Sequence, residues 1–453
     1  MKQQTLKMTT PIADFVKQYA ESDFVRFHMP GHKGKSFLGC EAFDITEIKG
    51  ADSLYEANGI IAESEANATK LFDSGHTFFS TEGSSQCIRA MLYLALCVSQ
   101  KKRTGERPLV AASRNVHKTF IYAAAMLDFD VIWLWPEKAS SSICSCFVSE
   151  EQVAKAFKEH PEIEAVYLTS PDYLGGQLDI KSIAEVCHKN EAVLAVDNAH
   201  GAYLKFLEKS QHPLDLGADL CCDSAHKTLP VLTGGAYLHI SKNAPKQFCE
   251  QAKYALNLFG STSPSYLILS SLDLCNQYLS EEYSDKLKNF IVLRNDCCVQ
   301  LKKAGWRVAE SDPLKITIEI PNGVSSSDLT QTLRENHIEC EFADPDYIVF
   351  MVTPENTKED LHKLVEILGC NHYLYSKKEA VAMVFAKSVM SIREAMFSLP
   401  ECVSVSEAEN RICRVPTVSC PPAIPIAVPG ELITKELMEI FEYYGVTSLD
   451  VVE

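Results

Sequence analysis

The stretch AVLAVDNAHG, residues 192–201, decides the fold that this sequence predicts. A short apolar run of alanine, valine and leucine ends at Asp197, and small and polar residues, including His200, follow it. This pattern is typical of a buried strand whose carboxyl end carries functional side chains. The next apolar run, in ADLCCDSAHKTLP at residues 218–230, ends in the same way shortly before Lys227.

Strand-like and helix-like segments alternate on both sides of these two stretches, from about residue 78 to residue 241. Strand-like runs rich in Val, Leu and Ala are PLVAAS, DVIWLW, AVYLTSP and GGAYLHIS, and helix-like stretches such as IKSIAEVCHKN lie between them. This alternation predicts an α/β fold with a mostly parallel sheet. Ligands of such folds bind at the carboxyl ends of the strands.

Three parts are predicted along the chain. Residues 1–285 form an N-terminal arm and the large, ligand-binding domain. Residues 286–375 carry amphipathic segments such as LKITIEI and KEDLHKLVEIL, which indicate a smaller α+β domain. Residues 376–453 form a C-terminal domain, in which VPTVSCPPAIPIAVPGE alternates apolar residues with proline and so predicts an ordered, extended loop.

The composition narrows the possible classes of protein. The chain has 453 residues and a net charge of −17, and because an acidic surface repels phosphate backbones, nucleic acid is not an expected partner. The N-terminus lacks the apolar run of a signal peptide, and no apolar segment is long enough to span a bilayer comfortably. The 17 cysteines are odd in number and form no CxxC pair, so we expect reduced thiols, no metal site and a cytoplasmic protein.

Three polar groups at strand ends together suit one chemistry. The segment STEGSSQ opens a helix with small hydroxyl residues, which is typical of a phosphate-binding site. A desolvated lysine such as Lys227 can lose its charge and form a Schiff base, and a carboxylate such as Asp197 can keep a heterocyclic nitrogen protonated. Phosphate, aldehyde and ring nitrogen are the groups of pyridoxal phosphate that a protein must bind. Taken singly, each feature has a simpler interpretation as a helix cap, a turn acid or a solvated lysine.

Five motifs, in chain order, resemble those of the Orn/Lys/Arg decarboxylase family: HMPGHKG, DNAHG, DSAHKTLP, STSPSY and PPAIPIAVPGE. The resemblance covers nearly the whole chain, and DSAHKTLP is its most specific motif. It implies the aspartate-aminotransferase-like fold (fold type I), the cofactor pyridoxal 5'-phosphate and a homodimer or higher homo-oligomer. It also implies the short form of the family, without a receiver-like N-terminal domain.

The resemblance implies a role for each of the motif residues. Lys227 forms the Schiff base, Asp197 pairs with the pyridine nitrogen, and His117, in SRNVHKTF, stacks on the cofactor ring. Further contacts are implied for Gly83, Ser84, Ser85, Gln86 and Ser224 at the phosphate, for Ala199, His200 and His226 beside the ring or the substrate, and for Ser261 and Thr262 at the phosphate of the partner subunit.

The implied reaction is the decarboxylation of arginine, lysine or ornithine to CO2 and an amine of polyamine-type metabolism. The proton that returns to Cα comes from Lys227, His226 or another nearby group. Another pyridoxal enzyme of this fold, such as an aminotransferase, is the alternative, because it would share Lys227 and Asp197. A P-loop nucleotide hydrolase, suggested by the end of MPGHKGKS, is disfavoured because Met29 stands where that motif needs glycine.

Several residues depart from the family pattern and bear on the expected substrate. Asn198 stands where the family commonly has Glu, and Glu82 lies beside the phosphate-binding segment. Cys420 and Ala423 replace the Tyr and Gly of a Tyr-Pro-Pro-Gly motif. Glu431 is a candidate partner for the distal cation of a basic substrate. Alternatively, Glu431 is a first-turn acid of the helix that follows it.

Overall fold

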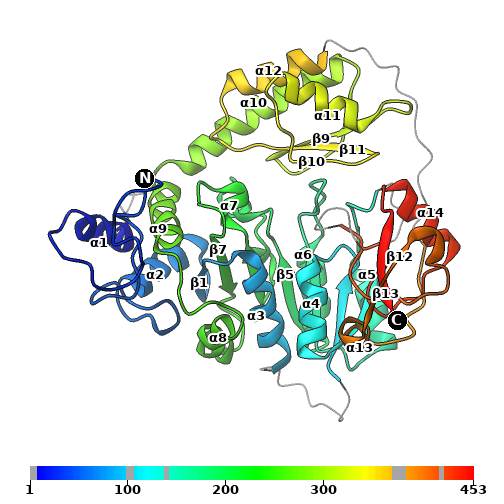
Figure 1. The fold of residues 1–453 in the computed structure, drawn as a ribbon, viewed down its shortest axis with the longest axis horizontal. Coiled ribbons are helices and arrows are strands. Elements are labelled where there is room, and N and C mark those ends of the chain that lie inside the picture. Colours follow the sequence, from blue (N-terminus) through cyan, green and yellow to red (C-terminus); the bar gives the residue numbers. More distant parts are fainter. Residues whose placement is uncertain (1–7, 98–106, 137–141, 370–383, 418–422) are drawn as a thin grey trace. The chain divides into compact units, whose positions relative to one another are not determined.

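The computed structural model describes residues 8–97, 107–136, 142–369, 384–417 and 423–453 (Figure 1). The chain divides into two compact units. Unit 1 comprises Met1–Gln100 and Val193–Lys288, and unit 2 comprises Lys101–Ala192 and Asn289–Glu453. Each unit therefore combines segments that lie far apart in the sequence. The domain boundaries predicted after residues 285 and 375 stay predictions.

Among its described residues, unit 1 has strands in the order β1-β7-β6-β5, of which Figure 1 labels β1, β7 and β5. Their bounds are β1 His76–Ser80, β5 Val193–Asp197, β6 Leu220–Asp223 and β7 Ala236–Ile240. Strands β5 and β6 are parallel, and β7 is antiparallel to both β6 and β1. The register pairs Asp197 with Cys222, so the carboxyl ends of β5 and β6 lie at the same edge of the sheet.

Helices surround these strands and leave every residue of β6 and β7 buried, as is typical of sheets covered on both faces. The helices are α1 Pro11–Ala20, α2 Ile60–Phe72, α3 Gly83–Cys97, α7 Ala225–Thr228, α8 Lys246–Leu258 and α9 Tyr266–Glu281. Asp273 of α9 caps helix α1, because its Oδ2 accepts hydrogen bonds from the N–H groups of Ile12 and Ala13 at 2.9 and 3.0 Å. This cap fixes the first helix onto the unit.

In the described part of unit 2, parallel strands follow the order β4-β2-β3. The strands, the helices between them and the helix after the last strand are β2 Leu109–Ser113, α4 Lys118–Leu127, β3 Asp130–Leu134, α5 Glu150–Glu159, β4 Ala165–Thr169 and α6 Ile180–Lys189. The sequence predicted this alternation of strands and helices. With the parallel pair β5 and β6 of unit 1, it confirms an α/β fold with mostly parallel strands.

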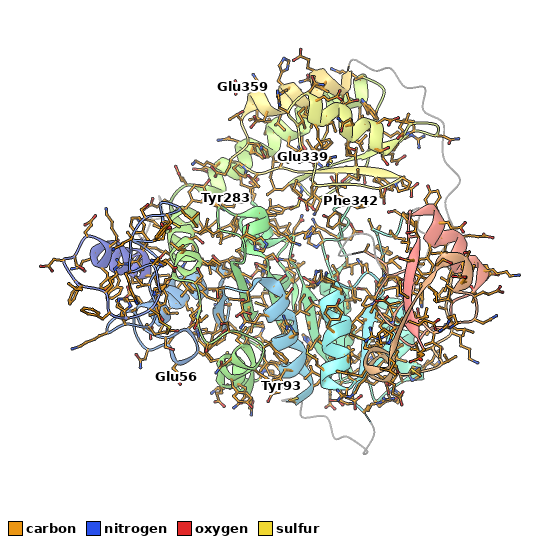
Figure 2. The ribbon with its side chains drawn as sticks, in the orientation of Figure 1. Glu56, Tyr93, Tyr283, Glu339, Phe342 and Glu359 are labelled. Atoms are coloured by element: carbon orange, nitrogen blue, oxygen red, sulfur yellow. The ribbon has the colours of Figure 1, made fainter. Side chains whose placement is uncertain are left out.

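A second sheet of unit 2 has the antiparallel order β10-β11-β9-β8. The strands of this sheet and the helices that alternate with them are β8 Arg307–Val308, β9 Lys315–Glu319, α11 Ser326–Glu335, β10 Phe342–Ala343, β11 Tyr347–Met351 and α12 Lys358–Gly369. The long helix α10, Tyr283–Lys303, precedes them in the chain. Figure 2 shows Tyr283 on α10 and Phe342 on β10. Antiparallel strands with helices agree with the α+β pattern predicted for this part of the chain.

The last part of unit 2 pairs β12, Pro400–Ser404, with β13, Ser448–Val452, and adds helices α13, Ile392–Phe397, and α14, Lys435–Tyr443. The described part of the proline-rich loop is ordered and buried, as Ile424 and Ile426 show. Cys420 lies outside the described residues. The interpretation of Glu431 as a first-turn acid is wrong, because α14 begins at Lys435 and Thr434 caps it.

Candidate active site

The two strand-end motifs that the sequence singled out meet in unit 1. Lys227 lies in α7, the short helix that follows β6, and its Nζ is 2.9 Å from Nε2 of His200. His200 belongs to the turn that follows β5 and is 2% exposed. The contact therefore joins DNAHG to DSAHKTLP at the carboxyl ends of two adjacent parallel strands, where ligands of such sheets bind.

Asp197 ends β5 and is 1% exposed. Its Oδ1 accepts a hydrogen bond from the N–H of Ala199 at 3.1 Å and faces Sγ of Cys222 at 3.6 Å. A carboxylate held in this way at a buried strand end is suited to an ion pair with a protonated ring nitrogen, because few water molecules compete for it.

The predicted phosphate-binding segment begins helix α3 immediately after β1. Gly83 is the first residue of the helix and has φ of +72°, a conformation that favours glycine. Ser224 Oγ donates a hydrogen bond to Ser84 Oγ at 2.7 Å, so the hydroxyl groups of two motifs meet at the N-terminus of a 15-residue helix. N–H groups in a helical first turn have no partners within the helix, and the helix dipole favours an anion there.

Two of the predicted phosphate ligands are limited by the contacts they already make. The Gln86 amide is fully buried: its nitrogen donates to Tyr55 Oη and to the carbonyl of Leu256, both at 2.8 Å, and its oxygen accepts from Ser80 Oγ at 2.5 Å. Both amide hydrogens are thus used, and a phosphate contact from Gln86 requires its backbone N–H. Gly83 donates its N–H to the carbonyl of Gly234 at 2.7 Å. This N–H is therefore not available to a phosphate, and Gly83 contributes only the conformation of the turn.

His226 precedes Lys227 and is partly buried. Its Nδ1 lies 2.9 Å from the carbonyl oxygen of Gly235, which can only accept, so Nδ1 carries the proton and Nε2 is left as the acceptor of a neutral ring. Burial lowers the pKa of His226, and the charge of Lys227 lowers it further, although the bond to Gly235 opposes both. A neutral imidazole beside Lys227 can accept or relay a proton at neutral pH.

The remaining predicted site residues lie in three places. Thr262 and Ser261 are exposed in the loop between α8 and α9, and the N–H of Ser261 donates to the carboxylate of Glu82. Ser85 lies in the first turn of α3, and its carbonyl accepts from Arg89. His117 belongs to unit 2, where Nδ1 accepts from the N–H of Thr119 at 3.2 Å and so caps α4. The roles of Thr262, Ser261, Ser85 and His117 toward a cofactor stay predictions.

A buried cluster that sequence reasoning missed lies at the end of β6. Oδ2 of Asp223 is 3.1 Å from Nε2 of His212 and 3.0 Å from Nε2 of His239, and Oδ1 accepts from the amide of Asn198 at 2.7 Å. All four side chains are fully buried. Asp223 and Asn198 directly adjoin predicted site residues, but the two histidines belong to no motif, and only His239, in the apolar run GGAYLHIS, has a sequence context that suggests burial.

Glu431, the candidate partner for a substrate cation, is already bound within unit 2. Its two carboxylate oxygens accept hydrogen bonds from Nη1 and Nη2 of Arg114 at 2.8 and 2.7 Å, and one of them also accepts from the N–H of Val428 at 2.9 Å. Arg114 and Glu431 are 0% and 2% exposed. A carboxylate held by a buried guanidinium is not available to a second cation, so this candidate role for Glu431 is not supported by its contacts.

Comparisons with known proteins identify the family of this chain. The family model described as Orn/Lys/Arg decarboxylase, major domain, matches residues 10–317, and the model of the C-terminal domain matches residues 372–448. The chain belongs to the Orn/Lys/Arg decarboxylase family. An arginine decarboxylase of Bacillus subtilis (strain 168) is 29% identical to this family member over 459 residues, which cover 94% of this chain and 92% of the relative. The predicted enzyme class, an amino-acid decarboxylase, is confirmed.

Solved structures of other decarboxylases share the fold of this family member. The Francisella novicida lysine decarboxylase superposes with a TM-score of 0.81 at 17% sequence identity and covers 99% of this chain and 82% of its own. Lysine decarboxylase A from Pseudomonas aeruginosa gives a TM-score of 0.79 at 18% identity, with 98% and 80% covered. The predicted fold class is therefore confirmed. Among the described helices, none is both long and apolar enough to cross a membrane.

Proposed function

We propose that this protein decarboxylates a basic amino acid with pyridoxal 5'-phosphate as its cofactor and releases CO2 and the corresponding amine. The observation that carries the proposal is the contact of Lys227 with His200, which unites a strand-end lysine with the turn after the buried carboxylate of Asp197. The relatives named arginine decarboxylase and lysine decarboxylase support a basic substrate. Pyridoxal phosphate, when bound, supplies an aldehyde that binds amines and a ring that accepts the electron pair released with CO2.

The donor set of unit 1 fits the three groups of this cofactor. Lys227 provides the amine for covalent attachment, and Asp197 provides a buried carboxylate for the ring nitrogen. Ser84 and Ser224 provide hydroxyl groups at a helix N-terminus for the phosphate. These residues come from three segments, and each was predicted from its position at a strand end.

Proton transfer in this site involves two histidines whose hydrogen bonds differ. His200 Nε2 lies within hydrogen-bonding distance of Lys227 Nζ and can take a proton from the ammonium group, which leaves a nucleophilic amine. His226 keeps its proton at Nδ1 against the carbonyl of Gly235, so its Nε2 can accept a proton from a bound group. Lys227 and His226 both remain candidates for the return of a proton to the substrate.

The proposal is tested by the products of the reaction. Holoenzyme is incubated separately with arginine, lysine, ornithine and leucine, and both CO2 and amine are measured. We expect CO2 and the matching amine from at least one basic substrate and none from leucine. An aminotransferase, the alternative with the same lysine and acid, would transfer the amino group to a keto acid without releasing CO2, and that result would overturn the proposed reaction. The proposal includes a role for the amine product in polyamine-type metabolism, which rests on the family resemblance alone.

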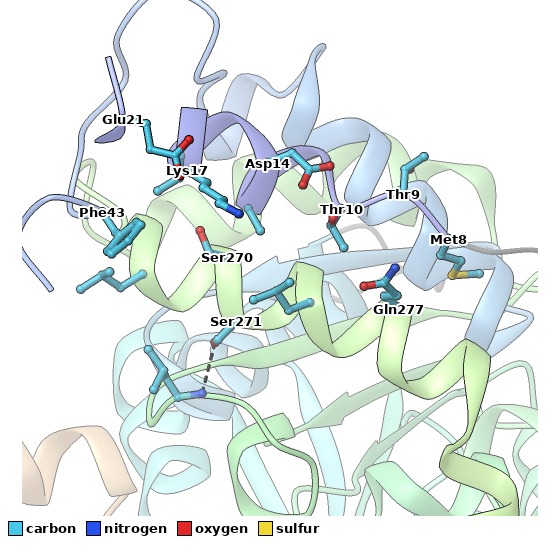
Figure 3. Close-up of a pocket in the computed structure, with 15 residues that line it drawn as sticks. Met8, Thr9, Thr10, Asp14, Lys17, Glu21, Phe43, Ser270, Ser271 and Gln277 are labelled. Atoms are coloured by element: carbon cyan, nitrogen blue, oxygen red, sulfur yellow. Dashed lines mark hydrogen bonds between the residues drawn. The ribbon is translucent and has the colours of Figure 1, made fainter. Parts of the chain in front are cut away.

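We further propose that the functional unit is a homodimer or higher homo-oligomer. The N-terminal segment of unit 1 exposes large apolar side chains, with Phe27 and Leu38 exposed by 92% and 89%. A groove of about 890 Å3 between α1 and α9 lies beside Phe43 of the same segment (Figure 3). Soluble monomers rarely expose so many apolar side chains in one segment, and a second copy of this chain is the occupant that the proposal assigns to this surface.

Sedimentation of the wild-type chain and of a Phe27→Ser/Leu38→Ser variant tests the assembly. We expect the wild type to sediment as a dimer or larger species and the variant to dissociate at higher protein concentrations. A wild-type protein that is monomeric at micromolar concentration would refute the proposal. A cytoplasmic location is proposed from the cysteines, since no disulfide links any of the described ones.

A further inference from the structure

Asn198 occupies the junction between the predicted cofactor acid and the histidine that contacts Lys227. Its backbone N–H donates to the carbonyl of Cys222 at 3.0 Å, and its carbonyl accepts from the N–H of Gly201 at 2.7 Å. Its side-chain nitrogen donates to Oδ1 of Asp223 at 2.7 Å. Three hydrogen bonds therefore fix the first residue of the turn that carries His200.

Gly201 restricts the same side chain from the other end of the turn. A Cβ atom at position 201 would lie 2.0 Å from Oδ1 of Asn198, so the Asn198 amide packs directly against the glycine Cα. The Asn198 amide thus has Asp223 as the acceptor of its nitrogen and Gly201 in close contact with its oxygen. The position of His200 in the middle of this turn depends on that amide.

Asp223 presents a charged acceptor to Asn198. Burial alone would raise the pKa of this carboxyl, but His212 and His239 outweigh it and hold the pKa of Asp223 well below its usual value. Oδ2 receives the two histidines, and Oδ1 receives Asn198. Because the anion needs a donor on its second oxygen, an amide at position 198 fits, whereas the carboxylate expected from the resemblance would require an additional proton.

The carboxylate of Asp223 and the rings of His212 and His239 could also suggest a metal site. Their hydrogen bonds, however, favour a network without a metal ion. His212 Nδ1 accepts from the N–H of Leu214 at 3.4 Å, so the ring N–H lies on Nε2 and points to Asp223. His239 Nδ1 faces Thr77 Oγ1 at 2.9 Å, which allows the same arrangement. A metal would need deprotonated Nε2 atoms in both rings.

We propose that Asn198 is a positioning residue for the reaction: its hydrogen bond to Asp223 holds the turn that places His200 on Lys227. The amide itself touches neither substrate nor cofactor in this scheme and acts through His200. The inference rests on the proposed function for its kinetic consequence, but the placement of His200 can be measured without substrate. Misplacing a catalytic group by about 1 Å can lower turnover up to roughly 100-fold.

Exchange of the two partners tests the hydrogen bond. Asn198→Asp replaces the donor with an acid of the same shape, and Asp223→Asn replaces the acceptor with an amide. The double variant restores one donor and one acceptor across the same contact. We expect each single variant to lose about 10- to 100-fold in kcat with a smaller change in KM, and the double variant to recover most of the loss. Asn276→Asp, a buried asparagine of α9 in the same unit, controls for the burial of a new carboxylate.

Two results would overturn the proposal. One is a folded Asn198→Asp protein with the kcat of the wild type. The other is a double variant that regains the thermal stability of the wild type without regaining kcat, because a purely structural role predicts that pattern. If a single variant does not fold, the double variant still decides between these outcomes.

A measurement without cofactor or substrate separates this proposal from the proposed function. In cofactor-free protein labelled with 15N-histidine, the His200 signals, assigned with a His200→Gln variant, should change in both single variants and return in the double variant. Unchanged His200 signals in the single variants would refute the positioning role even in an active decarboxylase. A wild-type protein that releases no CO2 from any basic amino acid, with His200 signals that respond as expected, would refute only the proposed function.

Discussion

Removal of one partner of the buried Arg114–Glu431 pair should destabilise unit 2 much more than removal of both. A buried ion that loses its partner destabilises a protein by about 3–5 kcal/mol, whereas apolar replacement of the whole pair is often neutral or stabilising. The relevant variants are Arg114→Met, Glu431→Leu and the double variant. Their side chains are close in size to those they replace, so the cavity contribution stays small.

The surroundings of the pair predict different losses for the two single variants. The guanidinium of Arg114 lies 4.7 Å from the ring centre of Trp133 and 4.5 Å from that of Trp135, and it also donates to the carbonyl of Pro425. Cation–π contacts of up to about 2 kcal/mol would remain in Glu431→Leu. The free energy of unfolding of this variant should therefore decrease by about 3 kcal/mol. In Arg114→Met the carboxylate of Glu431 keeps only the N–H of Val428 among these donors. The free energy of unfolding should therefore decrease by about 5 kcal/mol.

Urea unfolding followed by tryptophan fluorescence measures these losses in unit 2, because the three tryptophans of the chain all belong to that unit. With an m-value of about 3 kcal/mol/M, a loss of 3 kcal/mol lowers the midpoint by about 1 M urea. Lys155→Met is the matched control, since Lys155 pairs with Glu159 at the surface and its loss should be below about 1 kcal/mol. A double variant destabilised by the sum of the two single losses would refute the reasoning.

The other predictions concern the site, the pH dependence of stability and the thiols. Reduction of the holoenzyme with borohydride, followed by peptide mapping, should place the pyridoxyl group on Lys227, and a label on another lysine would contradict the assignment. Asp197→Asn should retain cofactor but lose most decarboxylation, because an amide stabilises a protonated ring nitrogen less well than a carboxylate; near-normal turnover would exclude the proposed role. Burial raises the pKa of Asp273 to about 6 from its usual 3.8. The folded protein therefore keeps a proton that the unfolded chain releases. Through this group, the free energy of unfolding should decrease as the pH rises from about 4 to about 6. Asp273→Asn should reduce that slope in urea titrations at several pH values, and an unchanged slope would count against it. Iodoacetamide should modify the exposed Cys402 of native protein before Cys222, whose pKa is raised by burial and by the charge of Asp197. Mass spectrometry after short exposure checks that order, and the reverse order would be inconsistent with the structure.

The sequence predicted the parts of the site that depend on local pattern. Buried strands and the polar residues at their ends follow from short apolar runs, and the structure has Asp197 at the end of β5 and Lys227 in the short helix after β6. The resemblance implied that His200 lies near the cofactor ring, which stays a prediction, whereas its contact with Lys227 was not predicted. Since parallel neighbouring strands end at one edge, the meeting of these motifs also followed from the predicted fold class.

Contacts between residues far apart in the chain could not be predicted in this way. Glu431 was assigned either to a helix or to a substrate cation, because nothing near it in the sequence indicates a partner 317 residues earlier. The side chain of Gln86 is used by Tyr55 and Leu256, which no phosphate motif contains. Asn198 was recognised as a departure from the family pattern, but its meaning required the position of Asp223.

The division of the chain into two interleaved units has a consequence for its biosynthesis. All segments of unit 1, which contain Lys227, Asp197 and His200, are synthesised before residue 289. In unit 2, the pair of Arg114 and Glu431 can form only after Glu431 has been synthesised. Domains tend to fold as units during translation, so the nascent chain should hold a folded first unit beside an unfinished second one. During that interval unit 2 holds strands β2 and β4, which are largely buried in the finished protein, without its C-terminal segment. A chain stalled between residues 289 and 430 should therefore be a good substrate for chaperones that bind exposed apolar strands.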